Sequence, residues 1–279
     1  MVGERKVVPR LFMTVLLYAF VFFLAFPFLW LIFTSLKSSS EIMMRGGSLL
    51  PQQVTFENYL TAVREERIVG SALNTLKVSV ASALLTLLIA TPAAYVLARR
   101  PKGINQPVIG WILVSQAFPL ILIIIPLFLI LNRLSLGNTH LGLVLVYVVW
   151  SLPFVIWMLR GYVQNIPVEI ELAAAIDGAN HLRIITQILI PLILPGLVAT
   201  GLYAFINAWN EFFFALVLLK SPELQTIQIN LARFRGIEGL ARWGPLAAGS
   251  VIATIPTLIL FGFIQRGLVS GLLSGGVKQ

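Results

Sequence analysis

Long runs of hydrophobic residues, separated by short polar segments, dominate the sequence. A helix needs about 20 mostly apolar residues to cross a hydrocarbon core of about 30 Å. By this criterion the pattern predicts an all-α membrane protein with six transmembrane helices. The predicted spans cover about residues 11–36, 73–98, 107–131, 140–160, 188–219 and 246–266.

The first predicted span lies near the N-terminus and has to be distinguished from a signal peptide. Its apolar run extends from Leu11 to Phe33, whereas the apolar core of a signal peptide has about 7–15 residues. No small-x-small cleavage site follows this run. We therefore expect the first span to be a retained transmembrane helix.

The composition agrees with a membrane protein. Charged residues make up 11% of the chain and hydrophobic residues 58%, whereas soluble domains carry about 25% charged residues. The net charge of +9 comes from short clusters between apolar blocks, which indicates charges flanking a membrane and not a nucleic-acid surface. Cysteine is absent, which excludes disulfides, thiolate metal sites and cysteine nucleophiles.

Basic residues near the first spans orient the chain. With the N-terminus inside, the 20 Lys and Arg residues divide equally between the two sides, so their total decides nothing. The first helix and the short loops carry most of the orienting signal. Arg5, Lys6 and Arg10 precede the first span, and Arg99 and Arg100 follow the second. We therefore expect both termini in the cytoplasm.

The segment between the fourth and fifth spans has a different pattern. Pro167 suits the first turn of a helix, where its missing N–H needs no partner. Glu169 and Glu171 follow, where the helix dipole favours acidic side chains, and Asp177-Gly178 then breaks the helix. A second amphipathic stretch leads into the fifth span. We expect two short helices that form a compact knob suited to docking in the groove of a partner.

This segment resembles the signature loop of the membrane subunits of bacterial ATP-binding-cassette (ABC) importers. That loop reads E-A-A, three residues, Gly, nine residues and I-x-L-P. The residues that match it in register are Ala173, Ala174, Gly178, Ile188 and Pro191. Leu172 stands at the position of the signature glutamate, which helps to bind the ATPase subunit in relatives. Glu171 and Glu169 are the carboxylates that can substitute for it.

The resemblance extends over nearly the whole chain and is strongest to the carbohydrate importers of the maltose type. The matching stretches include F-P-F-L-W at 26–30, F-E-N-Y at 56–59, A-L-N-T at 72–75, W-N-E-F at 209–212 and G-G-V-K at 275–278. The resemblance implies the type I ABC importer permease fold, with a single transmembrane permease domain over residues 1–279. It also implies the cytoplasmic membrane of a bacterium or archaeon.

The resemblance further implies a complex around this chain. Two different permease subunits form the pathway, and a dimer of ATP-binding subunits holds ATP and Mg²⁺ beneath them. An extracytoplasmic solute-binding protein delivers a sugar or related solute. The chain has no phosphate loop of the form G-x-x-x-x-G-K-[ST], so we expect it to bind no nucleotide and to catalyse no reaction itself.

The resemblance places the coupling to the ATPase in a cytoplasmic loop at about residues 161–190. The residues expected to carry this coupling are Glu169, Glu171, Ala173, Ala174, Asp177 and Gly178. Gly178 is the sharpest choice, because a turn with positive φ disfavours side chains. Gly178→Val should leave membrane insertion intact and abolish stimulated ATPase activity. The alternative is that the segment is a simple connecting loop.

A polar group inside the fifth span is the candidate solute pathway. Glu211 is the one acidic residue deep in an apolar span, and Asn207, Trp209 and Asn210 are its neighbours. An intramembrane carboxylate normally faces a cavity or a partner charge. Asn and Glu can bind sugar hydroxyls, and Trp can stack on a sugar face. A structural hydrogen-bond cluster between helices is an equally good interpretation.

Other classes of function have little support in the sequence. His140 and His181 have no companions at metal-ligand spacing, so we expect no metal site. An ion-coupled secondary transporter is typically built from repeated halves, and no repeat is visible. The nearest alternative is an ABC importer permease for another small solute. The sequence does not identify the solute.

Overall fold

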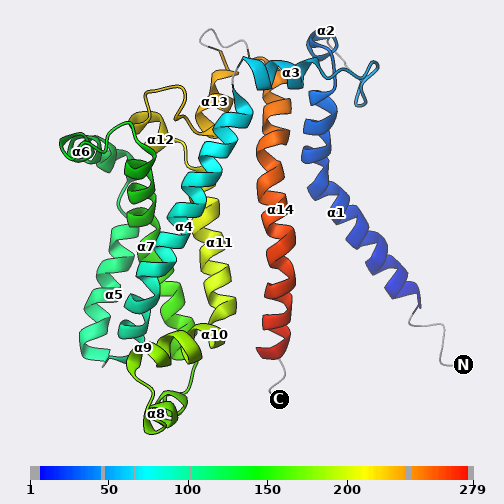
Figure 1. Ribbon diagram of the computed structural model, residues 1–279. Helices are drawn as coiled ribbons and strands as arrows, with labels where there is room; N and C mark the ends of the chain where they lie inside the picture. The colour runs from blue at the N-terminus through cyan, green and yellow to red at the C-terminus, as the bar shows by residue number, and fades with distance from the viewer. Residues whose placement is uncertain (1–6, 45–47, 66, 101, 237–240, 276–279) are drawn as a thin grey trace, which may run out of the picture. The chain divides into compact units, whose positions relative to one another are not determined.

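The computed structural model describes residues 7–44, 48–65, 67–100, 102–236 and 241–275, and every regular element in these ranges is a helix (Figure 1). The chain forms two compact units. Unit 1 comprises Met1–Val69 and Asn230–Ile255. Unit 2 comprises Gly70–Ile229 and Pro256–Gln279.

Among the described residues, four helices are long and apolar enough to cross a membrane. They are α1 (Val7–Ser35), α4 (Ile68–Arg99), α7 (His140–Gln164) and α14 (Trp243–Gly275). They correspond to the first, second, fourth and sixth predicted spans. α1 carries the apolar window with the highest mean hydropathy of the four, 2.5.

The third and fifth predicted spans are bent. The third consists of α5 (Lys102–Gln116) and α6 (Leu120–Arg133), which meet at 95°. The fifth bends by 80° before α11 (Leu194–Asn210). The described part of the chain therefore has six spans if each bent pair counts as one. Prolines next to both bends explain them, because proline suits the start of a new helix and cannot donate to the preceding turn.

Short elements connect these helices. They are α2 (Ser39–Met43), α3 (Glu57–Arg64), α8 (Val168–Ile176), α9 (His181–Arg183), the π-helix η2 (Ile184–Leu189), α10 (Ile190–Leu192), α12 (Phe213–Leu218) and α13 (Ile227–Arg233). The longest of them, α8, has nine residues and lies at one end of unit 2, beyond the end of α4 (Figure 1).

The core of unit 2 is built where α4, α7 and α11 pack together. Ala90 and Ala94 of α4 are fully buried, in one cluster with Leu159 of α7 and with Ala204 and Phe205 of α11. Small side chains allow helix backbones to approach closely in a membrane. This packing fixes α4 against α11, which carries the polar residues of the candidate pathway.

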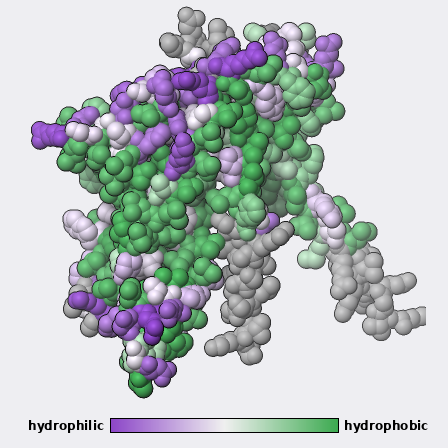
Figure 2. Space-filling model, viewed as in Figure 1, coloured by the Kyte–Doolittle hydropathy of each residue, from purple (hydrophilic) through white to green (hydrophobic). Residues whose placement is uncertain are grey.

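On the face shown in Figure 2, the coloured surface is apolar in the middle of the helices and hydrophilic towards their ends. Side chains such as Leu84 and Leu88 of α4 are 63% and 71% exposed. Many other large apolar side chains are exposed in the same way. A soluble helical bundle rarely exposes so large a continuous apolar area to water. The surface therefore fits a surrounding lipid bilayer.

Within unit 1, Asn58 of α3 is the central polar contact. Its amide nitrogen donates to the carbonyl oxygens of Ser35 at 3.0 Å and Lys37 at 2.7 Å. Gly244 lies so close that an added Cβ would stand 2.3 Å from the amide oxygen of Asn58. The side chain of Asn58 thus ties α3 to the end of α1 and lies against the start of α14.

Candidate coupling loop and solute pathway

Of the two short helices expected in the knob, the first is α8, which is bounded by turn residues; the second stretch consists of the three-residue α9 and the π-helix η2. Pro167 has an extended backbone directly before α8, and Gly178 has φ +85° directly after its end. The N–H groups of Gly178 and Ala179 donate to Ala175 and Ala174 at 3.1 and 3.0 Å. A residue with a Cβ would lose about 1–2 kcal/mol at this φ. Gly178 therefore ends the helix in the way that its sequence position predicts.

Glu171 faces the interior and ties α8 to α4. Its Oε1 accepts bonds from Nε and Nη2 of Arg99 at 2.8 and 2.5 Å. Its Oε2 accepts a bond from the Tyr95 hydroxyl at 2.8 Å. Nη2 of Arg99 also donates to the carbonyl oxygen of Ile166 at 3.1 Å. Both carboxylate oxygens of Glu171 are thus engaged within the chain.

The opposite face of α8 is exposed and largely apolar. By helical spacing it consists of Glu169, Leu172, Ala173 and Ile176, and all four are exposed. Leu172 is 58% and Ile176 87% exposed. Asp177 and Gly178 at the end of the helix are exposed too, whereas Ala174 is half-buried. We call Glu169, Leu172, Ala173 and Ile176 the outer face of α8.

A small hydrophobic cluster supports the base of the loop. Val163 of α7, Leu189 of η2 and Ile193 are buried together there, and Tyr95 packs against them. The π-helix η2 is what brings the chain from the knob back into this cluster. The loop is therefore attached at its base by packing and at α8 by the bonds of Glu171.

Glu211 lies at a break between two helices. α11 ends at Asn210, and α12 begins at Phe213. Oε1 of Glu211 accepts a bond from the N–H of Phe214 at 2.8 Å, and Oε2 accepts one from the N–H of Ala215 at 3.1 Å. The Tyr147 hydroxyl of α7 donates to the same Oε2 at 2.8 Å. The carboxylate therefore caps α12.

The other three candidate pathway residues occupy different environments. Trp209 is only 2% exposed and stacks on Phe205 in the core, with ring centroids 5.6 Å apart. Its ring is not accessible to a solute. The amides of Asn207 and Asn210 donate to carbonyl oxygens one turn back in their own helix, at 2.9 and 3.0 Å. Asn207 is half-buried and Asn210 is exposed, so both retain an amide oxygen to offer.

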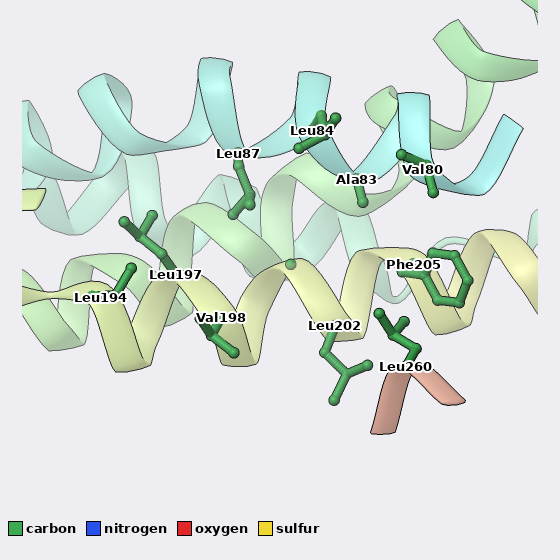
Figure 3. Close-up of a pocket in the computed structure, with 11 residues that line it drawn as sticks. Val80, Ala83, Leu84, Leu87, Leu194, Leu197, Val198, Leu202, Phe205 and Leu260 are labelled. Carbon is green, nitrogen blue, oxygen red and sulfur yellow. The ribbon is translucent and has the colours of Figure 1, made fainter. Parts of the chain in front are cut away.

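A groove of about 360 Å³ lies beside this region, between α4 and α11, with Leu260 of α14 at one end (Figure 3). The side chains that line it are apolar and include Leu84, Leu87, Val198 and Leu202. Such a surface has no side-chain partner for sugar hydroxyls, and unpaired polar groups are costly to bury. The groove does not extend the polar candidate pathway.

Unit 1 contains a more polar pocket of about 720 Å³, formed by α2, α3 and the start of α14. Glu57 of α3 and Glu65, directly after α3, line it together with Arg242 and Trp243. Arg242 forms an ion pair with Glu65 at 2.8 Å. The sequence did not predict this pocket, because its parts are distant along the chain.

Tyr95, Arg99 and Tyr147 were not identified as site residues from the sequence. Tyr95 and Arg99 are four positions apart and share a helix face, which is the only local signal. Their partner Glu171 lies 72 positions beyond Arg99. For metals, the described residues contain no group of three or more His, Cys, Asp or Glu that could hold an ion.

Curated relatives match the chain over most of its length. It is 51% identical over 230 residues to a putative ABC transporter permease, ORF1 of Streptomyces antibioticus, covering 82% of this chain and 100% of that protein. It is 35% identical over 253 residues to the sulfoquinovosyl glycerol transport system permease SmoH of Agrobacterium fabrum, covering 91% and 88%. It is 34% identical over 256 residues to the diacetylchitobiose uptake permease DasC of Streptomyces coelicolor, covering 91% and 92%.

Solved structures agree with these relatives. A chain of a bacterial ABC transporter that imports the acidic polysaccharide alginate superimposes with a TM-score of 0.77 at 25% identity, covering 95% of this chain and 98% of that chain. The family model for the binding-protein-dependent transport system inner membrane component matches residues 90–273. That range includes α8 and the break at Glu211. The chain is therefore an ABC transporter permease, a membrane transport subunit that belongs to the family of binding-protein-dependent transport system inner membrane components.

Proposed function

We propose that this chain is one of two different permease subunits of an ATP-driven sugar importer. The outer face of α8 is the observation that carries the proposal. An apolar helix face exposed at one end of a membrane bundle needs a partner, and in this family the partner is the ATP-binding subunit. ATP and Mg²⁺ are held by that subunit, so this chain supplies the docking helix and half of the pathway.

The docking proposed here is mainly hydrophobic. Leu172 replaces the signature glutamate, and Glu171 is engaged with Arg99 inside the chain. The partner's groove therefore meets Leu172, Ala173 and Ile176, with Glu169 at the edge of the contact. Burial of an exposed Leu or Ile side chain contributes about 1.5–3 kcal/mol. Burial of Leu172 and Ile176 can therefore supply much of the binding free energy between α8 and the groove. Asp177 and Gly178 close the helix and fix its orientation.

Sugars are the proposed solutes. This proposal is supported by the names of the relatives, which transport sulfoquinovosyl glycerol, diacetylchitobiose and trehalose. A chain of a methionine importer also matches, but at 17% identity, which shows the fold alone. In the pathway we assign Asn207 and Asn210 to sugar hydroxyls and Glu211 to holding the helix break beside them. Trp209 supports the same region from the core.

We further propose that both termini and α8 face the cytoplasm. The basic residues that precede the first span and those that follow α4 support this orientation. Unit 1 then contributes the polar pocket of α2 and α3 to the outer side. An extracytoplasmic binding protein has access to it there. Cysteine substitutions at Leu134 and at Ile176, labelled with a membrane-impermeant maleimide on intact cells, test the orientation: Leu134 should react and Ile176 should not.

Purification of the tagged chain from its native membrane in mild detergent tests the assembly. We expect an ATP-binding subunit and a second, different permease to co-purify. Isolation of the chain alone, or as a homodimer without an ATP-binding subunit, would overturn the proposal. The solute is tested by ATP hydrolysis of the reconstituted complex with its binding protein. Trehalose and diacetylchitobiose serve as sugar probes and methionine as the control, and stimulation by methionine alone would exclude the sugar assignment.

A further inference from the structure

We propose that Tyr95 and Arg99 are positioning residues that act through Glu171 to make α8 and the C-terminal end of α4 move as one body. This inference rests on the proposed function, because it concerns how a movement of the docking helix reaches the pathway. It assigns to Glu171 a role in transmission within this chain, distinct from direct contact with the ATPase.

The geometry around Glu171 holds its carboxylate from two sides. Arg99 donates two N–H groups to one carboxylate oxygen, and Tyr95 donates its hydroxyl to the other. The guanidinium also bonds the carbonyl oxygen of Ile166, in the turn before α8. Arg99 thus binds both the Glu171 side chain of α8 and the backbone just before α8. Charge-assisted bonds in such a fork fix orientation as well as distance.

Burial makes this ion pair different from a surface pair. The side chains of Arg99 and Glu171 are 16% and 9% exposed. Exposed pairs contribute little and are screened by salt, whereas a pair with little solvent contact keeps its geometry as long as its other bonds are satisfied. The Tyr95 hydroxyl and the Ile166 carbonyl supply those other bonds. The tie is therefore suited to transmit force.

Glu171 is also the only buried residue of α8. The outer face is exposed, and both ends of the helix lead into turns, at Pro167 and at Gly178. Without the tie, α8 would be held to the rest of unit 2 by those turns and by its contacts with η2. A docked partner could then tilt α8 without moving the bundle.

The tie reaches the pathway through α4. Ala94 directly precedes Tyr95, and Ala90 lies about one turn before Ala94 along the helix. Both are buried in the cluster that contains Phe205 and Trp209 of α11. Packed interfaces shift between discrete arrangements and do not deform continuously. A displacement of α8 that carries the end of α4 with it is therefore passed to α11, beside Asn207 and Asn210.

The absence of cysteine from the chain allows a direct test. Two nitroxide labels are attached at Val168→Cys on α8, beside the outer face, and at Leu88→Cys on the lipid-facing side of α4. The distance between them is measured by electron paramagnetic resonance in the purified importer complex, before and after trapping with ATP and vanadate. We expect one narrow distance distribution that is the same in both states.

Arg99→Ala and Glu171→Gln should broaden this distribution or shift it on trapping, while the ATP-binding subunit still co-purifies and hydrolyses ATP. The exchange Arg99→Glu with Glu171→Arg should restore the narrow distribution at least in part. Arg100→Ala is the matched control, because Arg100 is exposed next to Arg99, and it should change nothing. Melting temperature in detergent identifies any variant that fails to fold, in which case Arg99→Lys and Glu171→Asp replace it.

Two results would overturn the inference. One is a label distance that already changes on trapping in the otherwise unmodified chain. The other is an unchanged narrow distribution in Arg99→Ala and Glu171→Gln. Failure of the proposed function gives a different result, because no ATP-binding subunit would then co-purify with the unmodified chain.

Discussion

The Tyr147 hydroxyl donates a hydrogen bond of 2.8 Å to Oε2 of Glu211, across 64 positions of sequence. The same carboxylate accepts the N–H groups of Phe214 and Ala215, so it caps α12 and joins it to α7. Of the two interpretations open from the sequence, the contacts of Glu211 favour the structural one. The carboxylate gives the break in the fifth span a defined geometry.

Loss of this cap should destabilise the protein. Phe214 and Ala215 are buried, and an unsatisfied buried N–H costs about 1–3 kcal/mol. Glu211→Ala should therefore lower stability by at least about 2 kcal/mol, and Tyr147→Phe by about 1 kcal/mol. Thermal unfolding in detergent measures both. Asn207→Ala is the control with little effect, because its amide bonds only within its own helix. Equal melting temperatures for the unmodified protein and the three variants would contradict the capping role of Glu211.

Gly178→Ala should weaken coupling through the backbone alone. No atom lies within 4 Å of an added Cβ at Gly178, so the strain comes from φ +85° and amounts to about 1–2 kcal/mol. Gly178→Val should have a stronger effect in the same direction. Gly161→Ala is the matched control, since it also has open space around its Cβ but lies inside a helix, where alanine is favoured by about 1 kcal/mol. The rate of ATP hydrolysis by the complex should be lower with Gly178→Ala than with Gly161→Ala. Equal rates would exclude a special role for the turn at Gly178.

Ile176→Ser should weaken binding of the ATP-binding subunit without loss of stability. Ile176 is 87% exposed in this chain, so its substitution removes no internal packing. Its burial in a partner's groove would contribute about 1.5–3 kcal/mol, or about 10- to 100-fold in affinity. Leu134→Ser, at a 62% exposed leucine in the turn after α6, is the control. Quantitative co-purification compares them, and unchanged binding by Ile176→Ser would argue against the outer face as the docking surface.

Substitutions at Asn138 should lower the stability of the protein by graded amounts. Its Oδ1 accepts the N–H groups of Lys220 and Ser221 at 2.8 and 3.0 Å, and its backbone has φ +53°. Asn138→Asp keeps both acceptor contacts and should lose less than about 1 kcal/mol. Asn138→Ala loses them and adds strain at positive φ, and should lose about 2 kcal/mol. Melting temperatures in detergent should follow this order, and the reverse order would show that the turn does not depend on the Asn138 side chain.

The prediction of the spans and of the loop rested on local signals. An apolar run of about 20 residues has few alternatives to a membrane helix, so the four long helices appear where the pattern places them. Pro167 and Gly178 determine local backbone geometry, so the bounds of α8 follow the sequence closely. The bends within the third and fifth spans were not predicted, because their apolar runs continue through them.

The environments of Glu171 and Trp209 could not be predicted in the same way. Both residues lie in stretches that allow either an inward or an outward side chain. Glu171 turns inward because Arg99 and Tyr95 of α4 come within hydrogen-bond distance. Trp209 is buried because Phe205 and the alanines of α4 leave a space that its ring fills. The packing of distant helices decides each case.

Local patterns in the sequence were enough to predict the membrane class, six candidate spans, the knob between the fourth and fifth of them, and the family. These properties depend on apolar length and on residues close together along the chain. Only the packing of the helices shows that Glu169 is exposed while Glu171 is tied to α4, and that Glu211 caps a helix break. Those outcomes depend on the approach of α4 to α8 and of α7 to α12, since the position of a hydrogen-bond partner is set by packing and not by spacing in the sequence.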